Sequence, residues 1–136
     1  NDEKYPPQSM PSNIMLFKTI KPLIDANVST VYAVEAPLYS TYLQTAGRVD
    51  LIAKWNNKLA IIDFKTSNKG KRKEDILGYF LQTSCYAMMF KEMTGVTINQ
   101  IVIVIAVEDD HPQVFVEKVS NYEQQVERIF KQPAAI

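Results

Sequence analysis

The sequence predicts an α/β fold in which helices cover both faces of a central mixed β-sheet. Two apolar runs, 49–55 and 59–64, flank the polar triplet 56–58, a pattern typical of a β-hairpin. The almost uninterrupted apolar run 98–107 indicates a central strand that is covered on both faces. Apolar residues at helical spacing before the hairpin, after it and near the end of the chain predict the helices.

Length and composition restrict the class of protein. The 136 residues suffice for one domain, which we expect to span 1–136. The 15 basic and 15 acidic residues cancel, so any contact with nucleic acid requires a local cluster of charge. No apolar run reaches the roughly 18 residues of a membrane-spanning helix, and we expect no membrane partner. The single cysteine, Cys85, excludes an internal disulfide and a four-cysteine iron–sulfur cluster within this chain.

The N-terminal part is expected to be irregular at first. Residues 1–11 are polar and rich in proline, unlike a signal peptide, and lack an initiating methionine, so we expect a processed or excised piece. A helix should follow over about 12–26, bent or split at Pro22. Residues 29–36 have the composition of a strand, and 38–46 should form a second strand or arm, after which Gly47 should mark a bulge or bend. In that arm we expect three partly buried residues: Tyr39, Tyr42 and Leu43.

The hairpin is expected to bring two acidic residues together. Pairing across its polar turn sets Trp55 opposite Lys58, and the same register sets Asp50 opposite Asp63. Facing acids repel and cost stability. A divalent cation between them removes this cost, and carboxylate oxygens suit Mg²⁺ and Mn²⁺. Because strand side chains alternate, Lys65 lies on the same side as Asp63, although a strand-end pair of this kind can also be structural.

Two polar features follow the hairpin. The loop 69–73 carries four positive charges in five positions and is either solvated or a contact for phosphate groups. Residues 74–94 fit an amphipathic helix that ends at Gly95. On this helix Gln82 and Tyr86 share one face, so they are either boundary and core residues or residues that face the acids.

The C-terminal part is predicted to complete the sheet and cover it. After the strand 98–107, His111 lies in a turn and is expected to be solvated, and residues 113–119 alternate as a strand. A final helix should begin after Ser120 or Asn121 as its cap. Four of its apolar residues are expected to pack on the sheet: Tyr122, Val126, Ile129 and Phe130.

Three short segments resemble the motifs of one family. The segments GRVD at 47–50, DFKTS at 63–67 and QTSCY at 82–86 resemble GxxD, DxK and QxxxY of the RecB-like exonucleases in the PD-(D/E)xK nuclease superfamily. That group includes the mitochondrial genome maintenance exonuclease and phage relatives. A DxK pattern alone is weak, but the three in order, on a predicted hairpin and helix, are a strong signal. The resemblance implies a restriction-endonuclease-like three-layer sandwich with an αβββαβ core.

The resemblance also implies a function. It implies a Mg²⁺- or Mn²⁺-dependent exonuclease, free of an iron–sulfur cluster, that hydrolyses single-stranded or end-processed DNA in recombination, repair or replication. We expect it in the cytoplasm of a bacterial or phage-infected cell. The implied metal ligands are Asp50, Asp63, Glu35 on the preceding strand and the backbone carbonyl of Phe64, with Lys65 as base or electrostatic support. We expect DNA contacts from Gln82, Tyr86, Thr66, Ser67, Lys69, Lys71, Arg72 and Lys73.

Departures from the family pattern leave alternatives open. Val49 stands where the family name has proline, which is a frequent relaxation. Fuller RecB-like nucleases carry an additional helical segment, often with a metal-binding histidine, but no histidine precedes His111. Either the chain is a truncated core that needs an N-terminal segment or a larger recombination complex, or that ligand is absent and activity is weak. The competing interpretations are a non-cleaving DNA-binding module, a dimeric endonuclease or resolvase, and a purely structural domain.

Overall fold

A computed structural model describes residues 11–131 of the chain, with side chains from residue 18 onward. Five strands form one sheet in the order β1-β2-β3-β4-β5. The first three strands are an antiparallel meander, β4 runs parallel to β3, and β5 is antiparallel to β4. The expected mixed sheet is therefore confirmed. The strands are β1 (Val28–Ser40), β2 (Thr45–Trp55), β3 (Lys58–Ser67), β4 (Gln100–Val107) and β5 (Gln113–Lys118).

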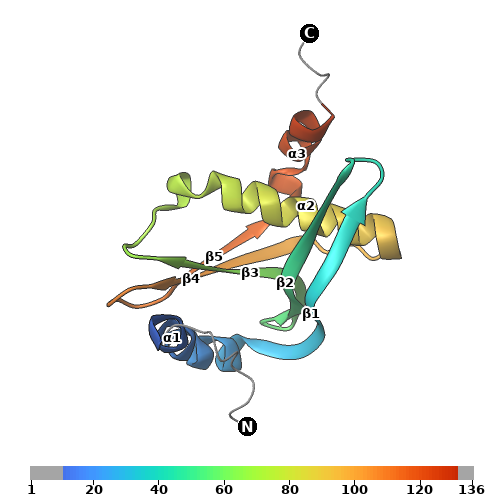
Figure 1. Cartoon of the computed structure of the whole chain (residues 1–136). Coiled ribbons are helices and arrows are strands. Elements are labelled where there is room, and N and C mark those ends of the chain that lie inside the picture. Colours follow the sequence, from blue (N-terminus) through green and yellow to red (C-terminus); the bar gives the residue numbers. More distant parts are fainter. Residues whose placement is uncertain (1–10, 132–136) are drawn as a thin grey trace.

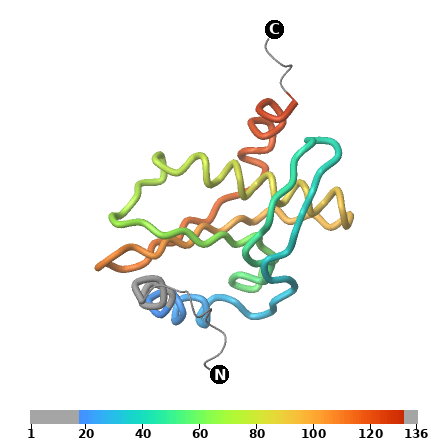
Figure 2. Tube along the Cα trace, viewed as in Figure 1, coloured from blue at the N-terminus to red at the C-terminus, as the bar shows by residue number. Residues whose placement is uncertain are grey.

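Helices cover the two faces of this sheet (Figure 1). Helix α1 (Pro11–Asn27) lies on one face and α2 (Leu77–Thr94) on the other, where α2 forms the crossover between the parallel strands β3 and β4. Helix α3 (Glu123–Phe130) packs mainly on α2. The chain trace shows the β1–β2 turn rising past α2 on the side where α3 lies (Figure 2). No helix in the range 11–131 is long and apolar enough to cross a membrane.

Alternating side chains of the strands build two cores. One core lies under α2 and holds Ile61, Ile101 and Ile103 from the sheet. The other lies under α1 and holds Ile62 and Val102, which neighbour them in sequence. Strand β4 contributes to both cores, which explains its uninterrupted apolar sequence. The sheet is thus fixed from both faces, and its strand ends have defined positions.

The hairpin register is confirmed. Trp55 pairs with Lys58 and Leu51 with Ile62, as predicted from the polar turn. Both turn residues, Asn56 and Asn57, have positive φ, of 51° and 70°, which suits a tight two-residue turn. The register that places Asp50 and Asp63 across from each other is therefore the one the protein adopts.

Three expectations about the elements before the hairpin were wrong or incomplete. Strand β1 runs through the expected boundary to Ser40, so no separate arm 38–46 exists. Its edge position explains how it tolerates Pro37, which has no amide hydrogen to donate. Tyr39 and Tyr42 are exposed and only Leu43 is buried. Helix α1 continues through Pro22 as one element, and of the predicted lead-in only Pro11, the first residue of α1, lies within the described residues.

The later helices also begin after the predicted residues. A 3₁₀ turn, η2 (Lys73–Asp75), precedes α2, which ends as predicted at Gly95 with a left-handed φ of 79°. A second turn, η3 (Val119–Asn121), precedes α3, so neither Ser120 nor Asn121 is its cap. Val126 is buried as expected. Ile129 and Phe130 are 51% and 40% exposed and lie beside α2 instead of on the sheet, which corrects the prediction for the last helix.

Candidate active site

The two acids of the hairpin meet where the β2–β3 ladder ends. The last pair of the ladder is Leu51 with Ile62, and the next positions are Asp50 and Asp63. There the Asp50 carboxylate replaces a backbone acceptor, because its Oδ2 accepts a hydrogen bond of 2.8 Å from the Phe64 amide. The strands therefore separate around a pair of carboxyl groups. The predicted juxtaposition of acids is a feature of the structure.

Asp63 is an unusually placed carboxyl group. It is 5% exposed, and its Oδ2 has no hydrogen-bond partner among the described residues. Burial raises the pKa of Asp63 to about 6, with further upward contributions from the neighbouring Asp50 and a downward one from the Lys65 ammonium. A buried, unsatisfied carboxylate oxygen is costly. The arrangement therefore favours positive charge at Asp63, which the Lys65 ammonium supplies in part.

Lys65 lies at the rim of this pair. Its Nζ is 3.1 Å from Asp63 Oδ2, an ion pair without hydrogen-bond geometry, and donates a hydrogen bond of 3.0 Å to Gln82 Oε1. The same ammonium lies 4.8 Å from the centre of the Tyr79 ring. The predicted same-side placement of Asp63 and Lys65 is therefore observed. The Asp63 carboxylate, the Gln82 amide and the Tyr79 ring thus hold the ammonium next to the acids, while part of the Lys65 side chain remains exposed.

The helix motif packs against the hairpin motif. Gln82 contacts Lys65, and Tyr86 is buried on the same helix face. Burial, and then the charges of Asp63 and Asp50, raise the pKa of Tyr86. A Cβ at Gly47 would lie 2.7 Å from that ring. Gly47 is thus required by the close approach of Tyr86 and forms neither the bulge nor the bend that we expected, because it pairs regularly with Leu38.

Glu35 is placed differently from the two aspartates. By register it lies across from Asp50, between the pairs Val34–Leu51 and Ala36–Val49. Its φ is 49°, its side chain is 70% exposed, and its carboxylate lies 3.7 Å from Arg48 Nη1. Within the described residues, no group of three acidic, histidine or cysteine side chains is gathered for a metal ion. The structure therefore joins Asp50 and Asp63 and leaves Glu35 outside the pair.

The basic loop divides into paired and unpaired charges. Arg72 forms an ion pair with Asp75 at 3.3 Å, and Lys73 forms one with Glu117 at 2.6 Å. No ion pair of Lys69 or Lys71 occurs with the described residues.

Two further contacts shape this loop. The Ser67 hydroxyl donates to the Lys69 carbonyl, and the Gln113 side chain bonds both the amide and the carbonyl of Lys71. Thr66 is exposed at the end of β3. The loop is thus anchored through its backbone, and the ammonium groups of Lys69 and Lys71 are the ones left to meet a phosphate.

Sequence reasoning missed Tyr79, which lies over the Lys65 ammonium. Its place one turn before Gln82, on the same helix face, is the signal that could have found it. His111 is exposed in its turn, as predicted. Cys85 is buried, and burial raises the pKa of its thiol to about 11, so it is no reactive thiolate.

Comparisons with known proteins bear on the family and the fold. The family model described as PD-(D/E)XK nuclease superfamily matches residues 15–134. Among solved structures, the chain is similar to a candidate exonuclease from Eubacterium rectale, with 17% identity and a TM-score of 0.58. It is also similar to the protein SSO0001, with 14% identity and a TM-score of 0.50. These likenesses show the fold, a restriction-endonuclease-like α/β sandwich. None of the curated proteins compared with the chain matches it.

The chain corresponds to only part of these structures. The first similarity covers 95% of this chain and 54% of the Eubacterium rectale protein, and the second covers 90% and 60%. The chain therefore spans little more than half the length of either protein.

Proposed function

Because this chain belongs to the PD-(D/E)XK nuclease superfamily, we propose that it is a divalent-metal-dependent DNA exonuclease of the RecB-like group. The substrate that we propose is a linear DNA strand in recombination, repair or replication. The observation that carries the proposal is the facing pair of Asp50 and Asp63 with the Lys65 ammonium at its rim. The proposal concerns this chain, which acts alone or with further segments of a larger protein.

The residues fit a divalent cation. The buried Oδ2 of Asp63 has no hydrogen-bond partner in the described part of the chain, and a second carboxyl group faces it. Oxygen ligands of this kind suit Mg²⁺ or Mn²⁺. Asp50, Asp63 and the Phe64 carbonyl would hold the ion, with Glu35 as a further ligand if it leaves Arg48. When bound, such an ion lowers the pKa of a ligated water and neutralises charge on the phosphate.

The remaining groups position the substrate. Gln82 and the Tyr79 ring hold the Lys65 ammonium where it can donate a hydrogen bond to a phosphate oxygen or to the attacking water. Preorganised donors stabilise the charge that develops during phosphodiester hydrolysis without having to reorient. Lys69 and Lys71 lie on the loop that follows the same strand and supply attraction for the strand's other phosphates.

The direct test is cleavage of DNA. The chain is incubated with linear single-stranded DNA in Mn²⁺, in EDTA, and as the Lys65→Ala variant. We expect degradation that requires both the metal and the lysine. Circular DNA of the same sequence should remain intact, because an exonuclease needs an end. Cleavage of the circle would make the protein an endonuclease, and binding without cleavage would make it a non-cleaving module.

A further inference from the structure

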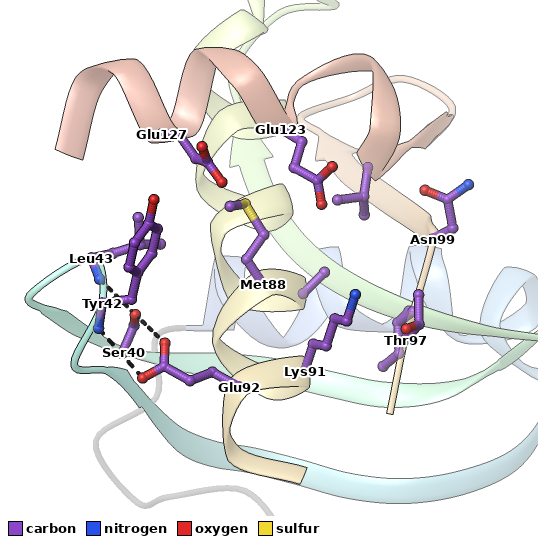
Figure 3. Close-up of a pocket in the computed structure, with 13 residues that line it drawn as sticks. Ser40, Tyr42, Leu43, Met88, Lys91, Glu92, Thr97, Asn99, Glu123 and Glu127 are labelled. Carbon is purple, nitrogen blue, oxygen red and sulfur yellow. Dashed lines mark hydrogen bonds between the residues drawn. The ribbon is translucent and has the colours of Figure 1, made fainter. Parts of the chain in front are cut away.

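Two cavities adjoin helix α2, and their linings differ in charge. One, of about 410 Å³, lies between the β1–β2 turn, α2 and α3 (Figure 3). Its charged lining residues are Lys91, Glu92, Glu123 and Glu127, so acids outnumber bases. The other, which we name the α2–α3 cleft, has a volume of about 320 Å³ and no charged residue in its lining. Both volumes fall in the range of about 300–1,000 Å³ found for ligand sites.

Apolar side chains form the walls of the α2–α3 cleft. Leu81, Cys85 and Met89 line it from α2, and Ile129 and Phe130 line it from the end of α3. The two α3 residues are 51% and 40% exposed, although both are large and apolar. Neighbouring exposed apolar side chains that line a cavity form a surface that a ligand can cover.

The cleft adjoins the candidate active site through two residues of α2. Gln82 and Tyr86 line the cleft, and the same Gln82 accepts the hydrogen bond from the Lys65 ammonium. Tyr86 lies close enough to Asp63 and Asp50 for their charges to raise its pKa. A group that fills the cleft is therefore a neighbour of any phosphate held at the two aspartates. The glutamate-lined cavity would repel a phosphate backbone, whereas the cleft contains no acid that would do so.

A glycine leaves space at the edge of the cleft. Gly78 lines it near the start of α2, and a Cβ there would meet no atom within 4 Å. Packing therefore does not require glycine at this position, and glycine is a weaker helix former than other residues. A side chain at this position would extend into open space at the edge of the cleft.

We propose that the α2–α3 cleft binds an unpaired nucleobase of the DNA strand that is cut, with the Phe130 ring as its stacking partner. The inference rests on the proposed nuclease function and names its substrate class: a strand with unstacked bases, either single-stranded DNA or a frayed end. An aromatic face accepts any of the four bases, so the cleft selects for strandedness and not for sequence. Bases inside a duplex remain stacked on each other and do not reach it.

The test compares intact and abasic DNA. Cleavage of a linear oligothymidylate of about 12 nucleotides in Mn²⁺ is measured beside oligonucleotides that carry one abasic residue at successive positions. For the unaltered chain, KM should rise about tenfold or more when the abasic residue occupies the cleft. Phe130→Ala should raise KM for the intact strand by a similar factor and remove the sensitivity to the abasic residue. Phe130→Tyr should behave like the unaltered chain, and a blunt duplex should be cut equally by all variants.

Two further variants separate binding from folding. Gly78→Leu places a side chain in the free space, and we expect it to raise KM for the single strand while maintaining or raising the melting temperature. Tyr32→Ala removes a ring of similar exposure on β1, outside the cleft, and should leave KM unchanged. Equal losses for Tyr32→Ala and Phe130→Ala would overturn the inference.

The remaining outcomes separate this inference from the proposed function. If the unaltered chain cuts the strand and abasic residues have no effect, base binding in the cleft is overturned and the proposed nuclease function stands. A second outcome is that the oligonucleotide binds in EDTA, in a way that depends on Phe130 and on the base, and yet is not cut in Mn²⁺. That outcome supports base binding in the cleft and overturns the proposed nuclease activity. Neither binding nor cleavage overturns both. A fall in melting temperature for both Phe130→Ala and Gly78→Leu with unchanged KM would mean that the cleft is a packing surface of the fold, which also overturns the inference.

Discussion

Two carboxyl groups of this protein, Glu92 and Asp63, have opposite surroundings. Glu92 accepts hydrogen bonds from the Ser40 hydroxyl at 2.5 Å and from the amides of Thr41 and Tyr42 at 2.8 and 3.4 Å (Figure 3). The Ser40 hydroxyl, together with these amides, lowers the pKa of Glu92. Asp63 is buried against a second acid, one of its oxygens has no hydrogen-bond partner in the described part of the chain, and its pKa is raised to about 6.

The difference separates a carboxylate with a structural role, Glu92, from one that we propose to be functional, Asp63. The donors around Glu92 are supplied by the β1–β2 turn, so the carboxylate ties that turn to α2 and its charge is satisfied within the fold. The fold satisfies Asp63 less completely: the Lys65 ammonium lies beside it, but burial and Asp50 still raise its pKa, so the charged form costs stability. A partner from outside the chain, such as a metal ion, is therefore expected at Asp63 and not at Glu92.

The largest expected effect comes from the matched substitutions Asp63→Asn and Glu92→Gln. Asp63→Asn should lower the cleavage rate by about 1,000-fold or more, because a metal ion contributes several kcal/mol of transition-state stabilisation. It should also raise the melting temperature without metal, since it removes the repulsion with Asp50. Glu92→Gln should lower the melting temperature and leave the rate unchanged. Cleavage assays measure the rates of the two variants, and thermal melts measure their stability. Equal losses of rate in the two variants would contradict the distinction between Asp63 and Glu92.

A smaller loss of activity is expected for Lys65→Ala. In the proposed function, the ammonium beside Asp63 supports the attacking water or the phosphate, and a group in such a role contributes about 100-fold or more. The loss should fall on kcat. Lys58→Ala, which removes an exposed lysine at the start of β3, is the control and should have no effect. Equal kcat values for the Lys65→Ala variant and the unaltered chain would exclude the lysine from the chemistry.

The pH dependence of stability should have opposite signs at the two acids. Without metal, the raised pKa of Asp63 means that the folded state binds its proton more tightly, so stability increases as pH falls through about 6 towards 3.8. The gain is on the order of 1 to 3 kcal/mol in urea unfolding and should disappear in the Asp63→Asn variant. The lowered pKa of Glu92 stabilises the fold above its unfolded value, 4.5, and this contribution is lost on further acidification. A stability that falls steadily from pH 7 to pH 4 would contradict the account of Asp63.

The smallest effect is expected at Glu35. Its carboxylate is exposed and lies beside Arg48, so Glu35→Gln should weaken Mn²⁺ binding by no more than about tenfold, much less than Asp63→Asn. Titration of Mn²⁺ followed by calorimetry measures both affinities. A loss equal to that of Asp63→Asn would mean that Glu35 leaves Arg48 and becomes a full ligand.

The sequence predicted the centre of the fold better than its ends. The turn residues Asn56 and Asn57 determine the hairpin register, and alternation then determines which side chains share a face. Local rules therefore sufficed to place Asp50, Asp63 and Lys65 together. Gln82 and Tyr86 were located by a resemblance, while spacing alone left their direction open.

The rest depends on contacts between distant residues. The need for Gly47 comes from the Tyr86 ring on α2, and the exposure of Phe130 comes from where η3 positions α3. The position of Glu35 depends on its left-handed backbone and on Arg48, neither of which has a local signature. Helical periodicity identified Ile129 and Phe130 as apolar face residues but could not show that they line a cleft.

The most direct test of the central claim is a thermal melt of the unaltered chain, the Asp63→Asn variant and the Glu92→Gln variant, each with and without Mn²⁺. If Asp50 and Asp63 hold the ion, Mn²⁺ raises the melting temperatures of the unaltered chain and of the Glu92→Gln variant, and leaves that of the Asp63→Asn variant unchanged. An equal rise in all three, or no rise in the unaltered chain, would show that the facing acids are not a metal site.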